Sequence, residues 1–312
     1  MAVINLIMPS ARGVEDETRI AVLKMIDENQ CRCGTHPPWE CNRGKHDIMW
    51  LPPFGTSIIH WTRNLMVSMA LFMRLPNEKR PPADFILMMD DDMVVKPAML
   101  KRLLSHNLDF VAGICTARRD PPIPNIRFWK PEKHTFLTPT EWDWDSQKLI
   151  EPDAVGSAFV LVKRKVLEDM AEGYLSCLFD RAADKRKGYD PMQVDAFWDK
   201  KEKLRRARFN TENWKQKDCW WFQFLDNVDN EQLGEFGEDI GFSIKAKMLG
   251  YRIFADPQVY PGHIGKYAYN IHDHIQFVLD QKAKGNMLEM TDTHPLFDQP
   301  LVVRAPEEVE VT

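Results

Sequence analysis

This sequence of 312 residues has no long apolar run, no internal repeat and no low-complexity segment. None of its apolar stretches approaches the roughly 18 residues that cross a bilayer, so we expect no membrane span. The stretch at 3–8 is short and has no basic leader, which is typical of a first strand and not of a signal peptide. These absences predict a soluble chain in a reducing cytoplasm, where the six cysteines are thiols or metal ligands in preference to disulfides.

Charge is distributed unevenly along the chain. Apolar residues make up 44% of the sequence, which is enough for a substantial core and excludes a disordered protein. The net charge is −5, yet residues 181–218 contain twelve Lys or Arg and seven Asp or Glu, a local net charge of +5. The rest of the chain is therefore strongly acidic, and the basic segment needs an explanation of its own.

The first half of the chain alternates between strand and helix signals. Strands are predicted at 3–8, 85–89, 110–115, 154–162 and 251–255, helices at 16–26, 62–73 and 97–104, and loops at 28–55 and 121–145. This order indicates an α/β fold in which helices cover both faces of a mostly parallel sheet. We expect one domain over 1–280, with a polar and basic insert at about 179–218, and a C-terminal extension over 281–312.

The strand predicted at 85–89 ends in three carboxylates. Five apolar residues run directly into Asp90, Asp91 and Asp92. A buried strand that ends in acid places its carboxylates at the rim of the sheet, where α/β proteins bind ligands. Because like charges this close repel, a positive group is expected there, most simply a divalent metal ion. The alternative is an acidic turn that only faces solvent.

A second acidic pair begins a helix. Ile240, Ile244 and Met248 fall on one helical face, so Glu238 and Asp239 occupy the first turn. The helix dipole favours ionised carboxylates in that position. The pair either takes part in catalysis or only caps and stabilises the helix. The capping explanation suits Glu238 better than Asp239.

Five features follow one another in an order that resembles the glycosyltransferases of the GT-A fold. They are the acidic-ended strand, Gly-Ser-Ala at 156–158, Trp-Phe at 221–222, Gly-Glu-Asp at 237–239 and Gly-His at 262–263. The sequence looks most like the family-2-like group, including its bacteriophage versions, over about residues 1–270. The resemblance implies a Rossmann-like GT-A domain with an acceptor-side insert. It also implies a host-cell cytoplasmic location if a phage encodes the chain.

The resemblance further implies a metal-dependent, inverting transfer of a hexose from a UDP-sugar to an acceptor hydroxyl. Asp92 matches the ligand of Mn²⁺ or Mg²⁺, and His263 matches the late histidine that completes the metal shell. Asp90 would contact the ribose or a metal-bound water. Asp239 matches the base that takes the proton of the acceptor, with Glu238 as its partner in the acidic pair.

Donor and acceptor contacts are also carried over from the resemblance. The residues expected around the nucleotide and its diphosphate are Pro9, Ser10, Arg12, Arg63, Asp90 and Asp91. Gly156 and Ser157 would lie under the donor sugar. Trp221 and Phe222 match an aromatic platform that faces the acceptor, although adjacent aromatics are equally compatible with the core. For Arg63 the alternative is a salt bridge on the surface of a helix.

The Cys-rich loop is not explained by the family. Cys31, Cys33, His36 and Cys41 provide the ligand types of a small structural Zn²⁺ site. Their spacing is not that of a standard zinc finger. A Pro-rich loop with free thiols is the alternative.

The basic insert at 179–218 is also unexplained, and Arg205 and Arg206 are typical of it. Solvated charge is the usual reason for such a run. A positive surface beside the active site would suit DNA, and a flipped 5-hydroxymethylpyrimidine of phage DNA is the preferred acceptor. A glycan, lipid or protein acceptor remains an alternative. Weaker alternatives are a nucleotidyltransferase and a non-catalytic module that binds DNA or carbohydrate.

Overall fold

The computed structural model describes most of the expected sheet and its helices. The described residues are 2–10, 13–32, 40, 45–53, 55, 58–72, 80–118, 122–133, 135–139, 147–172, 221–222, 225–226, 235–265, 268–269, 271–284, 287–289 and 302–304. The basic insert at 179–218 lies outside this set.

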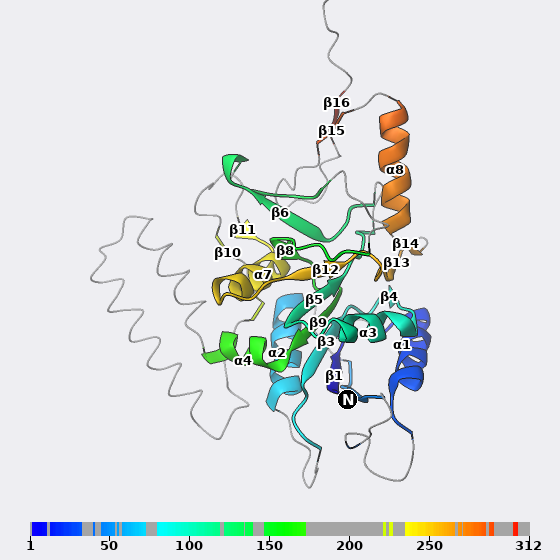
Figure 1. The fold of residues 1–312 in the computed structure, drawn as a ribbon, viewed down its shortest axis with the longest axis vertical. Helices are drawn as coiled ribbons and strands as arrows, with labels where there is room; N and C mark the ends of the chain where they lie inside the picture. Colours follow the sequence, from blue (N-terminus) through cyan, green and yellow to red (C-terminus); the bar gives the residue numbers. More distant parts are fainter. Residues whose placement is uncertain are drawn as a thin grey trace, which may run out of the picture.

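A six-stranded sheet forms the centre of the fold (Figure 1), with the strand order β12-β5-β9-β3-β1-β2. Its strands are β1 (Val3–Ile7), β2 (Asp47–Trp50), β3 (Phe85–Met89), β5 (Phe110–Gly113), β9 (Phe159–Lys163) and β12 (Phe254–Asp256). β9 runs antiparallel to both of its neighbours, and the other pairs in the sheet are parallel. The protein is therefore an α/β protein with a mostly parallel sheet, as predicted.

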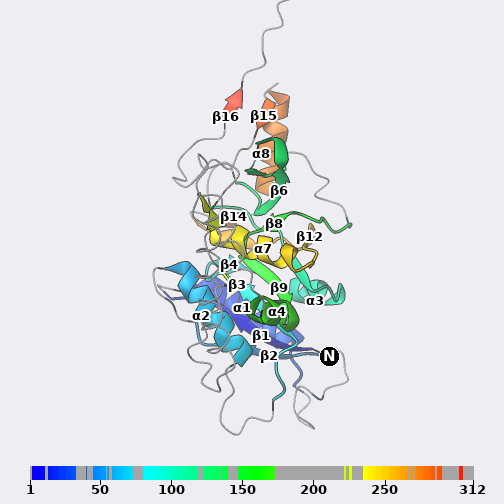
Figure 2. The same ribbon diagram turned by 90° about the vertical axis from the view of Figure 1, so that its left-hand side faces the viewer.

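Helices cover both faces of the sheet (Figures 1 and 2). They are α1 (Asp16–Asn29) and α3 (Pro97–Ser105) on one face, and α2 (Ile59–Phe72), α4 (Arg164–Glu172) and α7 (Glu238–Met248) on the other. Alternation within β1 divides the core, because Ile4 and Leu6 pack with α1 and α3 while Val3 and Ile7 pack with α2 and α4. Burial of each aliphatic side chain stabilises the folded state by about 1.5–3 kcal/mol.

Short strands bring residues 262–264 back to the carboxyl end of β3. β4 (Met93–Val94) follows the three aspartates and pairs with β13 (Gly262–Ile264), which in turn pairs with β14 (Ala268–Tyr269). In this register His263 lies opposite Met93, next to Asp92. Pairing with β4 therefore makes residues 262–264 an edge strand, which the sequence did not predict.

A second small sheet lies beside the central one. It has the order β7-β6-β8 and is built from β6 (Ile126–Lys130), β7 (Thr135–Leu137) and β8 (Ala154–Val155), with a 3₁₀ turn at Pro131–Lys133. The prediction of loop over 121–145 was wrong where β6 and β7 form. The strand expected at 154–162 is divided into β8 and β9 by a turn at 156–158. The β6–β7 hairpin is hard to predict because prolines and polar residues separate its short apolar stretches.

The remaining elements are one helix and two short hairpins. They are α8 (Ile271–Ala283), β10 (Leu225–Asp226) with β11 (Glu235–Phe236), and β15 (Met287–Glu289) with β16 (Val302–Arg304). The sequence did not predict α8 or β2. Among the described helices, none combines the length and apolar character that crossing a bilayer requires.

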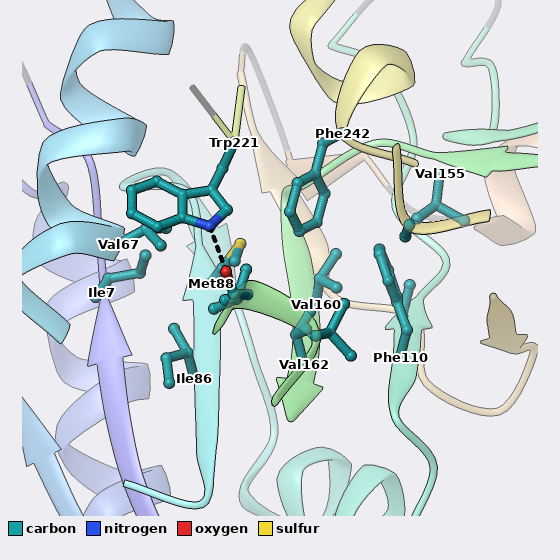
Figure 3. Packing of buried hydrophobic residues seen from close by; sticks show 14 of the residues in the cluster. Ile7, Val67, Ile86, Met88, Phe110, Val155, Val160, Val162, Trp221 and Phe242 are labelled. Carbon is teal, nitrogen blue, oxygen red and sulfur yellow. Dashed lines mark hydrogen bonds between the residues drawn. The ribbon is translucent and has the colours of Figure 1, made fainter. Parts of the chain in front are cut away.

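Trp221 and Phe222 lie in the core between the sheet and its helices. Trp221 belongs to one cluster with Val67, Met88 and Phe242 (Figure 3), and its indole nitrogen donates to the carbonyl of Leu167 at 2.8 Å. The ring of Phe222 stacks on Phe242, with 4.5 Å between the ring centroids. The two side chains are 1% and 0% exposed. The prediction that they face an acceptor is therefore wrong, and the core alternative is confirmed.

Asn64 of α2 holds the Trp221–Phe222 segment in place. Its Nδ2 donates to the Phe222 carbonyl at 2.8 Å, and its Oδ1 accepts from the Phe222 amide at 2.9 Å. One side chain therefore satisfies both backbone groups of a residue 158 positions away. Buried backbone groups require such partners, so this contact fixes α2 against the segment that precedes α7.

We expect Asn64→Ala to lower the free energy of unfolding by about 3 kcal/mol, because both backbone groups of Phe222 would be buried without partners. Leu65→Ala is the matched control on the same helix, since Leu65 is 50% exposed and its truncation should change the free energy by less than about 1 kcal/mol. Urea unfolding of the two variants measures the difference. Equal effects would show that the Asn64 contact contributes little.

Candidate active site

The site lies where β3, the turn between β8 and β9, and the first turn of α7 meet. The Asp90 amide donates to the carbonyl of Ala158 at 3.1 Å, which fixes the three aspartates to the 156–158 turn. Asp91 is tied to the chain before α1, because its carbonyl accepts from the Glu15 amide at 3.1 Å. The backbone thus brings together the carboxylates, Gly156 and Ser157 that the sequence predicted to share one site.

Arg63 of α2 is the centre of this arrangement. Its Nη1 lies 2.8 Å from Glu238 Oε1 and 2.6 Å from Asp239 Oδ1. Its Nη2 lies 2.9 Å from Asp90 Oδ1. The Arg63 side chain is only 8% exposed, so the guanidinium joins the acids of α7 to the acid that follows β3 inside the protein. The salt bridge that the sequence left open for Arg63 is present, but it is buried. Contact with a nucleotide stays a prediction.

The charges of this cluster influence one another. Burial lowers the pKa of Arg63, but the carboxylates of Asp239, Asp90 and Glu238 outweigh burial and raise it, so the guanidinium stays charged. Burial, and then repulsion from Asp239, raises the pKa of Glu238. One cation and three acids leave a negative excess, and buried charges are stable only while they remain paired.

The two oxygens of Asp239 have different surroundings. Oδ1 binds Arg63, whereas Oδ2 faces the 156–158 turn. A Cβ atom added to Gly156 would lie 3.7 Å from Asp239 Oδ2 and 3.2 Å from the Cβ of Asn125. Glycine at 156 therefore keeps the space beside the second oxygen free of side chain. Asp239 is also the more exposed acid, at 30% against 15% for Glu238.

Asn125 supports this turn and was not predicted from the sequence. Its Nδ2 donates to the Gly156 carbonyl at 3.2 Å, and its Oδ1 accepts from the Cys115 amide at 2.9 Å. Its backbone carbonyl also accepts from the Gly156 amide at 2.8 Å. Asn125 thus ties the segment that follows β5 to the turn that borders Asp239. A single asparagine in a Pro-rich stretch provides no sequence signal for such a role.

Asp92 and His263 face each other across the β4–β13 pair. His263 Nδ1 lies 2.7 Å from the Thr116 carbonyl, so that nitrogen donates. Burial lowers the pKa of His263, but its contacts with Asp92 outweigh burial and raise it, so without a cation the protonated ring pairs with Asp92 through Nε2. A metal ion would replace the Nε2 proton. Nε2 lies 3.1 Å from Asp92 Oδ1, which is buried. Adjacent ligands about 2.1 Å from an octahedral divalent ion lie about 3.0 Å apart, so the pair fits two positions of such an ion.

Protein side chains alone do not enclose a metal ion here. Within the described ranges, no group of three or more His, Cys, Asp and Glu side chains converges as a metal cage. Asp90 Oδ1 is bound to Arg63, so Asp90 as a metal ligand stays a prediction. Water or substrate oxygens would have to complete the shell around Asp92 and His263, as is usual for Mg²⁺ at phosphate sites.

Arg118 contacts the second oxygen of Asp92, and the sequence did not predict it. Its Nη1 lies 2.8 Å from Asp92 Oδ2, and its side chain is 52% exposed. Burial raises the pKa of Asp92, but His263 and Arg118 outweigh burial and hold the pKa below its ordinary value. The carboxylate therefore remains ionised between two nitrogen-bearing side chains.

The N-terminal turn borders the same rim. Pro9 and Ser10 are buried, and Ser10 Oγ accepts from the Gly13 amide at 3.0 Å. Burial raises the pKa of Asp91, an effect that its contact with Ser10 partly offsets. Ser157 is 2% exposed, and its hydroxyl makes no hydrogen bond in this structure. The nucleotide and sugar contacts assigned to these residues stay predictions.

Several predicted residues fall outside the part of the chain that the structure describes. They are Arg12, Arg205, Arg206, Cys33, His36 and Cys41. Cys31 is described and is a buried thiol. Nothing in the described residues therefore tests the zinc site or the basic acceptor surface.

No protein-family model and no curated protein matches the chain. Among solved structures it is similar to A197 from STIV, with 12% identity and a TM-score of 0.34 over 85% of this chain and 86% of that one. It is also similar to 4-diphosphocytidyl-2C-methyl-D-erythritol synthase from Anaerococcus prevotii, with 11% identity, a TM-score of 0.30 and coverage of 64% and 82%. HddC from Yersinia pseudotuberculosis matches with 10% identity, a TM-score of 0.27 and coverage of 54% and 80%. At these identities and TM-scores the similarities establish no function for this chain.

We expect Arg63→Met to lower the free energy of unfolding by about 3–5 kcal/mol at pH 7.5, because it leaves three acids without their buried partner. The loss should shrink at pH 5. Burial and repulsion from Asp239 already raise the pKa of Glu238, and loss of the guanidinium removes the contact that lowers it. The folded variant would therefore take up more protons than the unfolded chain and gain stability as pH falls.

Urea unfolding of wild type and Arg63→Met at both pH values measures this effect. Arg252→Met is the matched control, since Arg252 is 67% exposed and its pair with Glu151 lies on the surface. An equal loss from Arg63→Met at both pH values would contradict the electrostatic explanation.

Proposed function

We propose that this protein is a metal-dependent, inverting glycosyltransferase of the GT-A type that transfers a hexose from a UDP-sugar to an acceptor hydroxyl. The observation that carries the proposal is the position of Asp239 at the same rim as the Asp92–His263 pair. Arg63 joins Asp239 to Asp90, and Asp90 precedes Asp92 by two residues. A base and a cation-binding pair around one space are what glycosyl transfer from a nucleoside diphosphate requires.

Asp92 and His263 would hold a divalent cation, Mn²⁺ or Mg²⁺, through Oδ1 and Nε2. When bound, the cation would neutralise charge on the departing diphosphate. The Thr116 carbonyl supports this role because it fixes the His263 ring with Nδ1 protonated and Nε2 directed at Asp92. The turn at 156–158 would border the donor sugar, where the Ser157 hydroxyl is available for a sugar oxygen.

Asp239 would act as the base through Oδ2, while Arg63 holds Oδ1. The acceptor oxygen forms a bond to the anomeric carbon as its proton passes to Oδ2. The bond from that carbon to the diphosphate oxygen breaks, and its electron pair leaves with the diphosphate. Attack from the face opposite the leaving group inverts the configuration. Glu238 shares the same Arg63 nitrogen but is less exposed, so we assign it to positioning.

For the acceptor we retain 5-hydroxymethylpyrimidine in phage DNA. The support is the net charge of +5 over residues 181–218, which suits a polyanion. A glycan, lipid or protein hydroxyl is the alternative, and the assay below distinguishes them from DNA.

The proposal is tested with Mn²⁺, UDP-glucose and duplex DNA that contains 5-hydroxymethylcytosine, with unmodified DNA as the control. We expect a hexose-sized mass gain on the modified nucleoside alone, abolished by chelation of the metal. Asp239→Asn should reduce the rate about 10²–10⁴-fold, because its amide cannot accept the proton, whereas Glu238→Gln should cost less than about tenfold.

Three outcomes would change the assignment. Full activity of Asp239→Asn would remove the base, and turnover without metal would remove the roles of Asp92 and His263. Release of UDP to water without a mass gain on DNA would retain the glycosyltransferase and reject the DNA acceptor.

A further inference from the structure

Arg118 is the one described arginine that contacts the predicted metal ligand Asp92. It follows β5 by a few residues, on the same segment as Thr116, whose carbonyl orients His263. This segment therefore supplies a partner to each member of the Asp92–His263 pair. The sequence assigned no role to either residue.

The contact of Arg118 is one that a bound cation would disturb. Nη1 lies 2.8 Å from Asp92 Oδ2, while the other oxygen of that carboxylate faces His263 Nε2 at 3.1 Å. A divalent ion held by Oδ1 and Nε2 would lie close to the guanidinium and repel it. Because the Arg118 side chain is 52% exposed, it can leave Asp92 without opening the core.

Arg118 is also placed to receive a diphosphate. The oxygens of a diphosphate that completes the metal shell would lie beside Asp92, within the reach of a long arginine side chain. A guanidinium matches phosphate oxygens with two parallel hydrogen bonds. Arg63, to which the sequence assigned this contact, is 8% exposed and already binds three carboxylates. The phosphate contact therefore falls to the arginine that is half exposed.

We propose that Arg118 is the diphosphate-binding arginine of the donor site, and that it exchanges its partner, from Asp92 in the free protein to the donor diphosphate when the cation is bound. This inference rests on the proposed function. The exchange opposes binding of a cation alone and favours joint binding of cation and donor. Removing the charge of Arg118 should therefore strengthen binding of the cation alone and weaken binding of the nucleoside diphosphate.

The variants are Arg118→Gln and Arg118→Lys, with Arg252→Gln as the matched control. Arg252 is also an exposed arginine in an ion pair, with Glu151, outside the site. Binding of Mn²⁺ alone is measured by electron paramagnetic resonance, and binding of UDP at saturating Mn²⁺ by calorimetry. GDP is tested in parallel, and uridine serves as a ligand without phosphate.

Arg118→Gln should bind Mn²⁺ alone at least threefold more tightly and UDP with Mn²⁺ at least tenfold more weakly. Uridine binding should not change. The affinities of Arg118→Lys should lie between those of the wild type and Arg118→Gln, because lysine keeps the charge but cannot make two parallel hydrogen bonds to phosphate oxygens. Arg252→Gln should match the wild type in every measurement.

A structural role would weaken both ligands together, so weaker Mn²⁺ binding by Arg118→Gln would overturn the inference. The inference would also be overturned if Arg118→Gln had the wild-type melting temperature and unchanged affinity for UDP and GDP. The proposed function would stand in that case. If the wild type binds neither Mn²⁺ nor a nucleoside diphosphate, the proposed function fails and the inference fails with it.

Discussion

The site depends on the buried guanidinium of Arg63. It holds the carboxylates of Asp90, Glu238 and Asp239 at 2.6–2.9 Å, although these acids come from two different elements and would repel one another without it. The same contacts lock α2 to the sheet and to the first turn of α7. Stability and site geometry thus share one cation, and its loss would disturb both. The hydrogen bonds of the neighbouring Asn64 to Phe222 add a second fixed point on the same helix.

Strand pairing, rather than proximity in sequence, brings the proposed cation-binding pair together. Asp92 follows β3 and His263 lies in β13, and the antiparallel pairing of β13 with β4 sets their distance. The segment that follows β5 contributes Thr116 and Arg118. One oxygen of the Asp92 carboxylate faces an imidazole and the other faces an exposed arginine, which is the arrangement that the proposed exchange of partners requires. In the free protein the carboxylate is neutralised by side chains, and in the proposed complex by a cation.

The aromatic pair at 221–222 shows how a sequence pattern can be assigned to the wrong side of a protein. Two adjacent aromatics satisfy a core and an acceptor platform equally well, because both uses require large apolar surfaces. Burial decided the question, since the rings pack against Phe242 and the indole donates to Leu167. By contrast, Gly156 does lie at a close approach of other groups, and its place under the donor sugar stays a prediction. The group beside it is Asp239, together with Asn125.

The sequence by itself determined the α/β class, the acid-ended strand β3 and the acidic first turn of α7, because apolar periodicity and local charge specify elements without reference to their neighbours. It did not determine β2, the β6–β7 hairpin or α8, whose patterns are short or interrupted by polar residues and proline. Only the tertiary structure decided the partners of the charged groups. Arg63 and Asp239 lie 176 positions apart, and Arg118 gives no signal that it reaches Asp92. Ion pairs depend on which side chains the sheet order brings to one rim, and periodicity carries no information about that choice.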